Sequence, residues 1–349
     1  MFGEDRNMNP NNLFMTLVSI LIAVLLMLIA PPGGGEDQDN DDESTFECTV
    51  IFELNNGVDD NVSITVTKGE TISDPPTPAR YGYEFAYWSC ADEFFDINND
   101  ITSDLTLVAQ WGSAGLEYSV DGIVSRGTFY STHLLIPEYF NGIRIVGMND
   151  NAFRNCDFIE TVVIGNGIET IVDYAFYGCS FLTVTIGNSV KVIGNDAFSG
   201  CPIFTVTIPD SVKVIGIDAF WGCPLRTIVI GNGVETIGSS AFAGCQLKTV
   251  TIPDSVVSIG NTSFSQCSLL ETITIGSGVK TIGDYAFWGC EKFHDLYLPE
   301  SASGEIVTLG DGVFFDTPMF TIHAPSDLLD LYKNDSKWGS VNATWVILP

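Results

Sequence analysis

The chain has 349 residues, of which 17% are charged; acidic residues outnumber Lys and Arg 44 to 14, giving a net charge of −30 at pH 7. This balance argues against a nucleic acid partner, whose phosphates require clustered Lys and Arg, and against an anionic membrane surface. Acidity of this kind is typical of an exposed protein that stays soluble through charge repulsion.

The first feature along the chain is an uncharged apolar run at residues 13–30. As a helix it would rise about 27 Å, close to the thickness of the hydrocarbon layer of a membrane. The run is longer than the apolar region of a cleaved signal peptide, and Pro31 and Pro32 stand where a small-residue cleavage site would be. We therefore expect a transmembrane signal-anchor at 13–30, with a cleaved signal peptide as the competing interpretation.

Basic residues indicate the orientation of this anchor. Arg6 precedes the apolar run, and no Lys or Arg follows it until Lys68. The positive-inside rule therefore predicts a cytoplasmic tail at 1–12 and places the bulk of the chain outside the cell, so that the expected location is the cell membrane, single-pass. Residues 31–45 are acidic with nothing to bury, which predicts a disordered linker.

Residues 46–112 have the pattern of a small β module. Four short alternating runs, C-T-V-I-F-E-L, V-S-I-T-V-T, Y-E-F-A-Y-W and L-T-L-V-A-Q-W, are separated by turn signals such as Asn56-Gly57 and Lys68-Gly69. Four strands at this spacing predict a small sheet. Cys48 and Cys90 lie in the first and third runs. Outside the cytoplasm such a pair is compatible with a disulfide, and two independent buried thiols are the alternative.

This module resembles the internalin-type B repeat, also called the Listeria–Bacteroides repeat. That family has an F-x-x-N-x-G stretch, a K-G-x-x-I turn, a proline pair, G-Y-x-F-x-G-W and a closing L-x-A-x-W. The matching residues are Phe52, Asn55, Gly57, Lys68, Gly69, Ile72, Pro75, Pro78, Gly82, Tyr83, Phe85, Trp88, Leu107, Ala109 and Trp111. Tyr87 departs from the pattern, because the family has glycine there. The resemblance implies a β-grasp-like spacer or adhesion module on the outside of a cell, without chemistry of its own.

The rest of the chain is a repeat marked by seven cysteines at intervals of 22 or 23 residues: Cys156, Cys179, Cys201, Cys223, Cys245, Cys267 and Cys290. A fixed period of this length predicts a solenoid, in which coils too small to fold alone share one core. In the run T-V-T-I, alternation sends Val184 and Ile186 inward and leaves the threonines outside. The A-F-x-x-C segment then closes the coil, and we expect a single helical turn there.

The repeats define the remaining boundaries. The expected fold is mainly β: a solenoid of about eight coils at 133–322, preceded by an amino-terminal cap at 113–132 and followed by a carboxyl-terminal cap at 323–349. In the latter, Ser326–Lys333 has the pattern of a short amphipathic helix with Ser326 as its N-cap.

The repeat motif L-x-x-[VI]-x-I-[GP]-x-x-V-x-x-I-G-x-x-A-F-x-x-C resembles the BspA-type leucine-rich repeat over about 200 residues of this chain. Members of that family are bacterial, archaeal and protist surface proteins, several of them adhesins for host matrix proteins or for other cells. The resemblance therefore implies a surface protein that recognises an extracellular protein or glycan.

Catalytic and metal-binding motifs are not found in the sequence. The chain has no C-x-x-C pair, H-E-x-x-H, G-x-S-x-G or Walker loop. The repeated cysteines are interpreted as small buried apolar thiols, since a linear column does not converge on a zinc ion. His133, His294 and His323 occupy unrelated coil positions. We therefore expect neither a metal, a cofactor nor an enzyme activity.

The outward threonines are the candidate partner-binding face. Thr161, Thr183, Thr205, Thr227, Thr249 and Thr272 form one file, and Thr185, Thr207, Thr251 and Thr274 most of a second, interrupted by Val163 and Val229. Threonine also suits any solvated strand face, which is the simpler interpretation. The functional interpretation is a flat, nearly uncharged surface for a protein or glycan, with ice binding as a remote variant.

The expected function is cell-surface adhesion or recognition without catalysis, with the membrane involved only through the amino-terminal anchor. A structural component of the cell envelope without a foreign partner is the alternative, and a hydrolase is a remote third.

Overall fold

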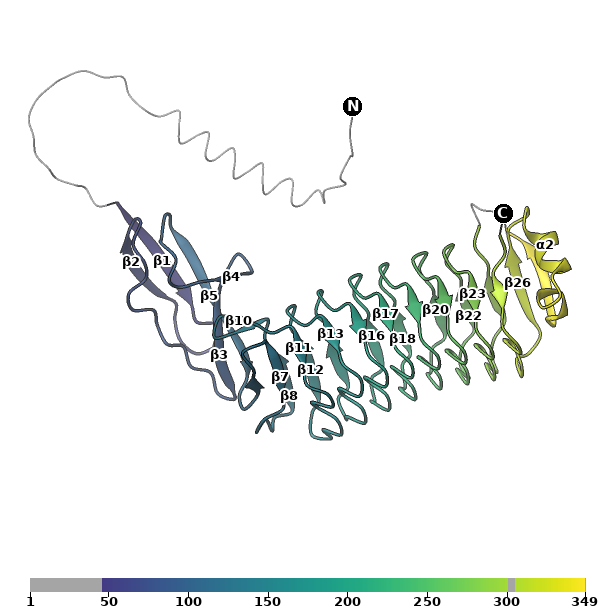
Figure 1. Ribbon diagram of the computed structural model, residues 1–349, viewed down its shortest axis with the longest axis horizontal. Helices are drawn as coiled ribbons and strands as arrows, with labels where there is room; N and C mark the ends of the chain where they lie inside the picture. Colours follow the sequence, from purple (N-terminus) through teal and green to yellow (C-terminus); the bar gives the residue numbers. More distant parts are fainter. Residues whose placement is uncertain (1–45, 301–304, 349) are drawn as a thin grey trace, which may run out of the picture. The chain divides into compact units, whose positions relative to one another are not determined.

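The computed structural model describes residues 46–300 and 305–348. The expected cytoplasmic tail, signal-anchor and linker lie outside the described residues. Within those two ranges, no helix is long and apolar enough to cross a membrane. The strands of the described part form a small sheet followed by a row of stacked coils (Figure 1).

The small sheet has five strands in the order β2-β1-β5-β3-β4. Their bounds are β1 (Glu47–Glu53), β2 (Val62–Thr67), β3 (Tyr83–Cys90), β4 (Glu93–Phe95) and β5 (Leu105–Ser113). The first and last strands pair in parallel at its centre, and the remaining pairs are antiparallel. The strand β4 is additional to the four predicted ones. It follows a tight turn at Ala91 and Asp92, which have φ of 48° and 66° without the Gly or Asn that signals such a turn.

The module's core combines aliphatic residues with the aromatic residues of the repeat pattern. The rings of Phe52 and Trp88 lie 4.8 Å apart edge to face, and Trp111 donates its indole N–H to the backbone oxygen of Asn55 at 3.1 Å. The register of β3 shifts next to Tyr87, where the pattern has glycine. The Tyr87 side chain instead contacts Tyr139, at 5.3 Å between ring centroids.

Short strands lead from the module into the solenoid. They are β6 (Glu117–Tyr118), β7 (Ile123–Ser125), β9 (Tyr139–Phe140), β10 (Ile143–Arg144) and β11 (Gly147–Met148). The strands β6, β7 and β11 form a three-stranded sheet. Phe129 packs edge to face on Phe153, the first phenylalanine of the coil stack, and so closes the amino end of the core.

One side of the solenoid is built from ten parallel strands, one from each coil. They are β8 (His133–Ile136), β12 (Thr161–Ile164), β14 (Thr183–Thr185), β16 (Thr205–Thr207), β18 (Thr227–Val229), β20 (Thr249–Thr251), β22 (Thr272–Thr274), β24 (Asp295–Tyr297), β26 (Phe320–Ala324) and β27 (Ala343–Ile347). They are hydrogen-bonded in groups of three, two and five. The solenoid thus has about 10 turns rather than the expected eight, because β26 and β27 extend the stack without the repeat motif.

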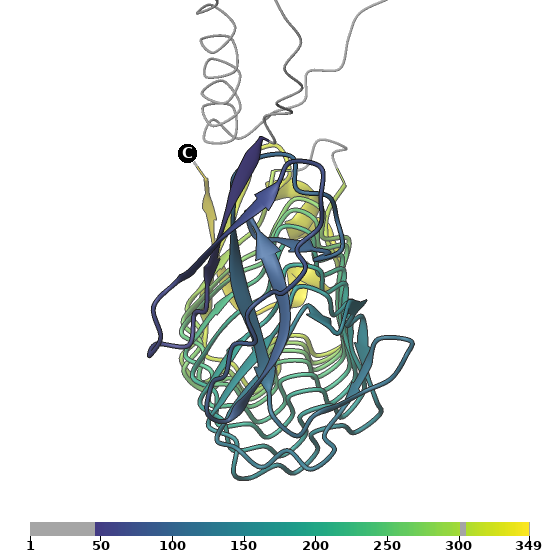
Figure 2. The same cartoon turned by 90° about the vertical axis from the view of Figure 1, so that its left-hand side faces the viewer.

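A second side, the short-strand sheet, contains seven parallel two-residue strands. They are β13 (Thr170–Ile171), β15 (Val192–Ile193), β17 (Val214–Ile215), β19 (Thr236–Ile237), β21 (Ser258–Ile259), β23 (Thr281–Ile282) and β25 (Thr308–Leu309). Viewed from the left-hand side of Figure 1, the coils lie behind one another (Figure 2). Each coil therefore stacks on the next in the same register.

The A-F-x-x-C segment is a pair of tight turns, which we call the phenylalanine turn, and the expected helical turn is wrong. Asp196 and Gly200, on either side of Phe198, have positive φ of 52° and 73°, which a helix does not allow. This geometry directs the Phe198 N–H to the oxygen of Ala219 in the next coil, at 2.8 Å. The segment is therefore a third ladder between coils.

Phenylalanines and cysteines fill the interior. Consecutive rings from Phe153 to Phe314 lie 5.2–5.7 Å apart and within 18° of parallel. The seven repeat cysteines are all buried and free. The thiols thus form the column that the repeat predicts. Burying one such large apolar side chain is worth about 1.5–3 kcal/mol, which makes the shared column the main source of stability.

The carboxyl-terminal cap contains the helix α2 (Leu329–Asn334) and the 3₁₀ turn η1 (Trp338–Ser340). The helix exists as expected, but its N-cap is Leu328, without a side-chain hydrogen bond, so the assignment of Ser326 as N-cap is wrong. Tyr332 and Trp338 anchor the cap. The Tyr332 hydroxyl accepts from the Val307 N–H at 3.3 Å, and the Trp338 indole donates to the Val307 oxygen at 2.6 Å.

Candidate functional site

The threonine face is the outward side of the strands β12 to β22. Hydrogen-bonded neighbours bring threonines of successive coils into register, as Thr161 beside Thr183 and Thr205 beside Thr227. The second file is aligned in the same way, with Thr251 beside Thr274. The structure therefore places the ten predicted threonines in two files on one face of the molecule.

The side chains of this face reach solvent. Those that are exposed are Thr183, Thr185, Thr205, Thr207, Thr227, Thr249, Thr251 and Thr274, whereas Thr161 and Thr272 are half-buried. Val163 and Val229, which interrupt the second file, are also exposed. Between β12 and β22 the outward strand positions carry hydroxyl and methyl groups without any charge. Such a surface is weakly polar and costs little to desolvate compared with a charged one.

Charged residues beside the short-strand sheet form ion pairs between coils. Lys191 and Glu169 of neighbouring coils form an ion pair at 2.9 Å, and Lys213 and Glu235 another at 3.1 Å. These pairs are exposed and so contribute little to stability. The threonine strands are likewise preceded by charged residues, Glu160, Arg226, Lys248 and Glu271, so the uncharged part of that side is the strand positions themselves.

The threonine face is hollowed at one junction between coils. The strands β14 and β16 belong to separate hydrogen-bonded sheets. A cavity of about 320 Å³ lies there, lined among others by Thr185, Thr205 and Thr207. Hydroxyl groups on both sides of a shallow hollow can donate and accept hydrogen bonds, which is what a polar protein or glycan group requires.

Both files continue beyond the residues that the sequence predicts. The register adds His133, Asp295, Thr321 and Thr344 to the first file. It adds Tyr297, His323 and Val346 to the second. These residues were missed because their strands lack the T-x-T pattern. For Asp295 the sequence does contain a signal, which is its distance from the preceding cysteine. Asp295 follows Cys290 by five residues, and Thr272 follows Cys267 by the same number.

A histidine and carboxylate cluster ends the face. His323 Nε2 lies 2.7 Å from Asp295 Oδ1, and His294 Nδ1 lies 2.6 Å from Asp295 Oδ2. Burial raises the pKa of Asp295, but the hydrogen bonds from His323 and His294 outweigh it and lower that pKa overall. The His323 ring stacks on Tyr297 at 4.2 Å. The three histidines, which the sequence leaves at unrelated positions, thus lie on or beside this one face.

Burial raises the pKa of five repeat thiols, from Cys201 to Cys290, whereas a hydrogen bond with Cys179 lowers the pKa of Cys156. Burial raises the pKa of both Cys201 and Cys290 to about 12. Such thiols are protonated at neutral pH, so they are poor nucleophiles and poor metal ligands. Among the described residues, no three His, Cys, Asp or Glu side chains gather as metal ligands.

The two cysteines of the module are not brought together. Cys48 lies in β1 and Cys90 at the end of β3, and β5 runs between these strands. Strands two places apart are separated by about 10 Å, whereas a disulfide requires Cα atoms about 4.4–6.8 Å apart. Both cysteines are free in the structure.

Family models match both parts of the described chain. Residues 147–224 and 213–335 match the BspA type leucine rich repeat region in six copies. Residues 49–110 match the Listeria-Bacteroides repeat domain. No curated protein matches the chain.

Solved structures of bacterial leucine-rich repeat proteins are similar to the chain. A leucine rich cell surface protein of Faecalibacterium prausnitzii A2-165 is 23% identical, over 59% of this chain and 73% of its own, with a TM-score of 0.39. The T. pallidum leucine rich repeat protein is 22% identical, over 67% of this chain and 97% of its own, with a TM-score of 0.45. A leucine-rich repeat protein of Eubacterium ventriosum is 20% identical, over 61% and 71%, with a TM-score of 0.33.

Proposed function

Because the chain belongs to the BspA-type leucine-rich repeat proteins, whose family model matches residues 147–224 and 213–335, we propose that it is a non-catalytic recognition protein of the cell surface. The threonine face binds an extracellular protein or glycan. The observation that carries this proposal is the alignment of the threonines. The outward positions of successive strands present two files of hydroxyl and methyl groups in register from coil to coil.

A long flat surface of this kind suits recognition better than catalysis. Many weak contacts spread over several coils can add up to useful affinity, because the coils hold them in a fixed spacing before the partner arrives. Threonine hydroxyls donate and accept hydrogen bonds to sugar hydroxyls and peptide groups alike. The methyl groups and the exposed Val163 and Val229 add apolar contact.

We further propose that residues 13–30 hold the chain in the cell membrane and that the module serves as a spacer. The apolar run in the sequence supports the anchor, and the matched Listeria-Bacteroides repeat supports the spacer. Protease treatment of intact cells checks this arrangement. It should remove the module and the solenoid while sparing cytoplasmic proteins, and a fully protected chain would contradict it.

The binding surface is tested with the full-length chain in two matched variants. The first replaces Thr205, Thr207, Thr249 and Thr251 by Lys on the threonine face. The second replaces Val214, Val257, Thr281 and Thr308 by Lys on the short-strand sheet. Both variants change exposed residues and add the same charge, although Val257 stands just before its strand, β21. They therefore differ in the face that they alter.

Immobilised chains are incubated with extracellular matrix proteins, a glycan array and an extract of the cell's own envelope. We expect the first variant to lose capture of its partner by at least about tenfold, which corresponds to 1.4 kcal/mol, and the second to keep it. Equal capture of the partner by both variants would contradict the proposal. Capture that is confined to envelope components would instead identify a structural role in the envelope.

A further inference from the structure

The phenylalanine turns are joined by a regular set of hydrogen bonds that run toward the carboxyl end. In seven successive turns the N–H of the phenylalanine donates to the next turn at 2.8–3.0 Å, as Phe198 does to Ala219. The N–H groups two residues before and after it, those of Asp196 and Gly200, also donate to the next turn at 2.8 Å. Each central turn therefore needs a following turn to satisfy three donors.

The last turn has no such successor. Its three equivalent donors are the N–H groups of Gly312, Phe314 and Asp316. Within residues 46–300 and 305–348 none of them donates a hydrogen bond. Gly312 and Asp316 are exposed and Phe314 is half-buried, so these donors are open to solvent and to an incoming acceptor.

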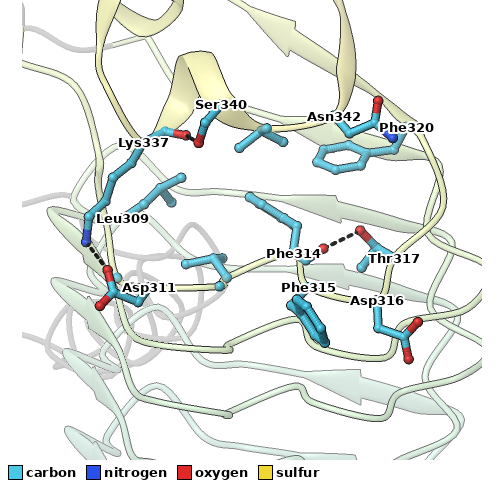
Figure 3. Close-up of a pocket in the computed structure, with 14 residues that line it drawn as sticks. Leu309, Asp311, Phe314, Phe315, Asp316, Thr317, Phe320, Lys337, Ser340 and Asn342 are labelled. Atoms are coloured by element: carbon cyan, nitrogen blue, oxygen red, sulfur yellow. Dashed lines mark hydrogen bonds and ion pairs between the residues drawn. The ribbon is translucent and has the colours of Figure 1, made fainter.

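A recess of about 420 Å³ lies at these donors. Figure 3 shows it between the last turn, with Phe314 and Asp316 on one side, and the cap residues Lys337, Ser340 and Asn342 on the other. Phe314 is half-buried, whereas the earlier rings of the stack are fully buried. The recess thus combines a partly apolar floor with a row of free donors.

The cap completes the other two sides of the solenoid and leaves this one open. The strands β26 and β27 continue the threonine-bearing side. Side chains of Tyr332 and Trp338 satisfy the backbone of Val307 beside the short-strand sheet. The cap thus extends beyond the last phenylalanine turn on those two sides, and the side with the three donors stays open.

We propose that this recess binds a short segment of polypeptide, whose backbone carbonyl groups accept the three hydrogen bonds as the next turn would. As in strand addition the backbone supplies the affinity, but the segment follows the tight turns of the last coil. The recess is separate from the threonine face. A test of one binding site therefore does not decide whether the other exists.

The charged residues at the two ends of the recess favour some peptide segments over others. Lys337 is paired with Asp311 at 2.8 Å at one end of the recess. Asp316 at the other end is exposed, and among the described residues it forms no ion pair. An incoming Lys or Arg gains this carboxylate as a partner, whereas an Asp or Glu meets repulsion. The preferred segment is therefore neutral or basic.

The first test is amide hydrogen exchange of the full-length chain. In the free protein the amides of Gly312, Phe314 and Asp316 should exchange at least about 100-fold faster than those of Phe264 and Phe287, because unpaired exposed amides need no opening of the structure. Slow exchange at the three positions in the free chain would overturn the proposal. So would protection that rises with protein concentration, since a second copy would then be the occupant.

The second test adds a probe, the acetylated and amidated peptide Lys-Thr-Val-Thr-Val-Thr-Lys. It should slow exchange at the three amides, and a twin with Glu in place of both Lys should do so at least about tenfold less well at equal concentration. Asn342→Trp fills the recess and should abolish the effect. Asn232→Trp, an exposed position in a central coil, should leave it unchanged. No slowing by the probe, or equal slowing in both Trp variants, would overturn the proposal.

Discussion

The thiol of Cys201 donates a hydrogen bond to the backbone oxygen of Phe176 in the preceding coil, with 3.0 Å between Sγ and O. The same contact recurs in six coils, from Cys179 to Cys290, at 2.8–3.5 Å. In the last turn Thr317 takes the cysteine position, but its hydroxyl donates to the backbone oxygen of Phe314 in its own turn, at 2.7 Å, and not to the preceding coil. Cysteine is therefore selected for a donor as well as for its small apolar volume.

Replacing Cys201 by Val should separate these two contributions. Valine leaves no cavity but is somewhat larger and removes the donor, so we expect a loss of about 1–2 kcal/mol in the free energy of unfolding beyond the cost of the added bulk. Cys48→Val is the matched control, because Cys48 is also buried and its thiol makes no hydrogen bond among the described residues. Urea unfolding of both variants provides the measurement. A cost at Cys201 no larger than at Cys48 would mean that the thiol acts only by filling space.

The buried thiols also predict a fall in stability at alkaline pH. The folded-state pKa of Cys201 and of Cys290 is raised by burial from 9.0 to about 12. The unfolded chain therefore loses these protons first, and stability that is complete below pH 9 declines as the pH rises toward 12. Each such thiol contributes a slope of up to about 1.4 kcal/mol per pH unit in this window.

A double variant with Cys201→Ala and Cys290→Ala isolates this effect. Between about pH 9 and 10 its stability should fall by about 2 kcal/mol less than that of the parent, about 1 kcal/mol for each thiol removed. The interval is chosen because the folded-state pKa of Tyr87 is also raised to about 12, from 10.0, and tyrosine would contribute above it. Parallel slopes for the two proteins would contradict the assignment.

The regular parts of the fold were predictable because they repeat. The cysteine interval defines the coil, and the T-x-T alternation places Thr205 and Thr207 outside and Val206 inside, as the structure has them. The conformation of the turns was harder to predict from the sequence. Asp196 and Tyr174 adopt positive φ, although neither is glycine or asparagine, because the ladder between coils requires that geometry. The A-F-x-x-C pattern alone is equally compatible with a helical turn.

The ends of the solenoid were harder to predict for the same reason. The strands β26 and β27 have sequences F-T-I-H-A and A-T-W-V-I without cysteine or the phenylalanine turn. They join the stack because a parallel edge is available to pair with, which is a property of the preceding coil rather than of their own sequence. The cluster of Asp295 with two histidines arises from this extension.

Two glycines offer a test of how closely the coils are stacked. A Cβ added at Gly238 would lie 2.5 Å from the carbonyl carbon of Gly216, whereas one added at Gly222 would meet nothing within 4 Å. Gly238→Ala must push two coils apart, so we expect a loss of about 3 kcal/mol or more. Gly222 has φ of +68°, so Gly222→Ala should cost only about 1–2 kcal/mol through backbone strain. Thermal unfolding of both variants measures the difference, and the reverse order would contradict the stacking.

The module should contain two thiols rather than a disulfide. In the sheet, Phe52 of β1 lies beside Leu107 of β5, and Ser89 of β3 lies beside the next residue, Val108. Cys90 therefore lies at the same height in the sheet as Phe52, which is four residues from Cys48 along β1. The strand β5 separates the two cysteines. Unfolding without reductant and alkylation with iodoacetamide should therefore modify all 9 cysteines of the chain. A product with only seven modified cysteines, which gains the last two after reduction, would show that the bridge forms and that the sheet order is different.

In the native chain Cys90 should react with iodoacetamide before Cys48, because Cys90 is half-buried whereas Cys48 is buried.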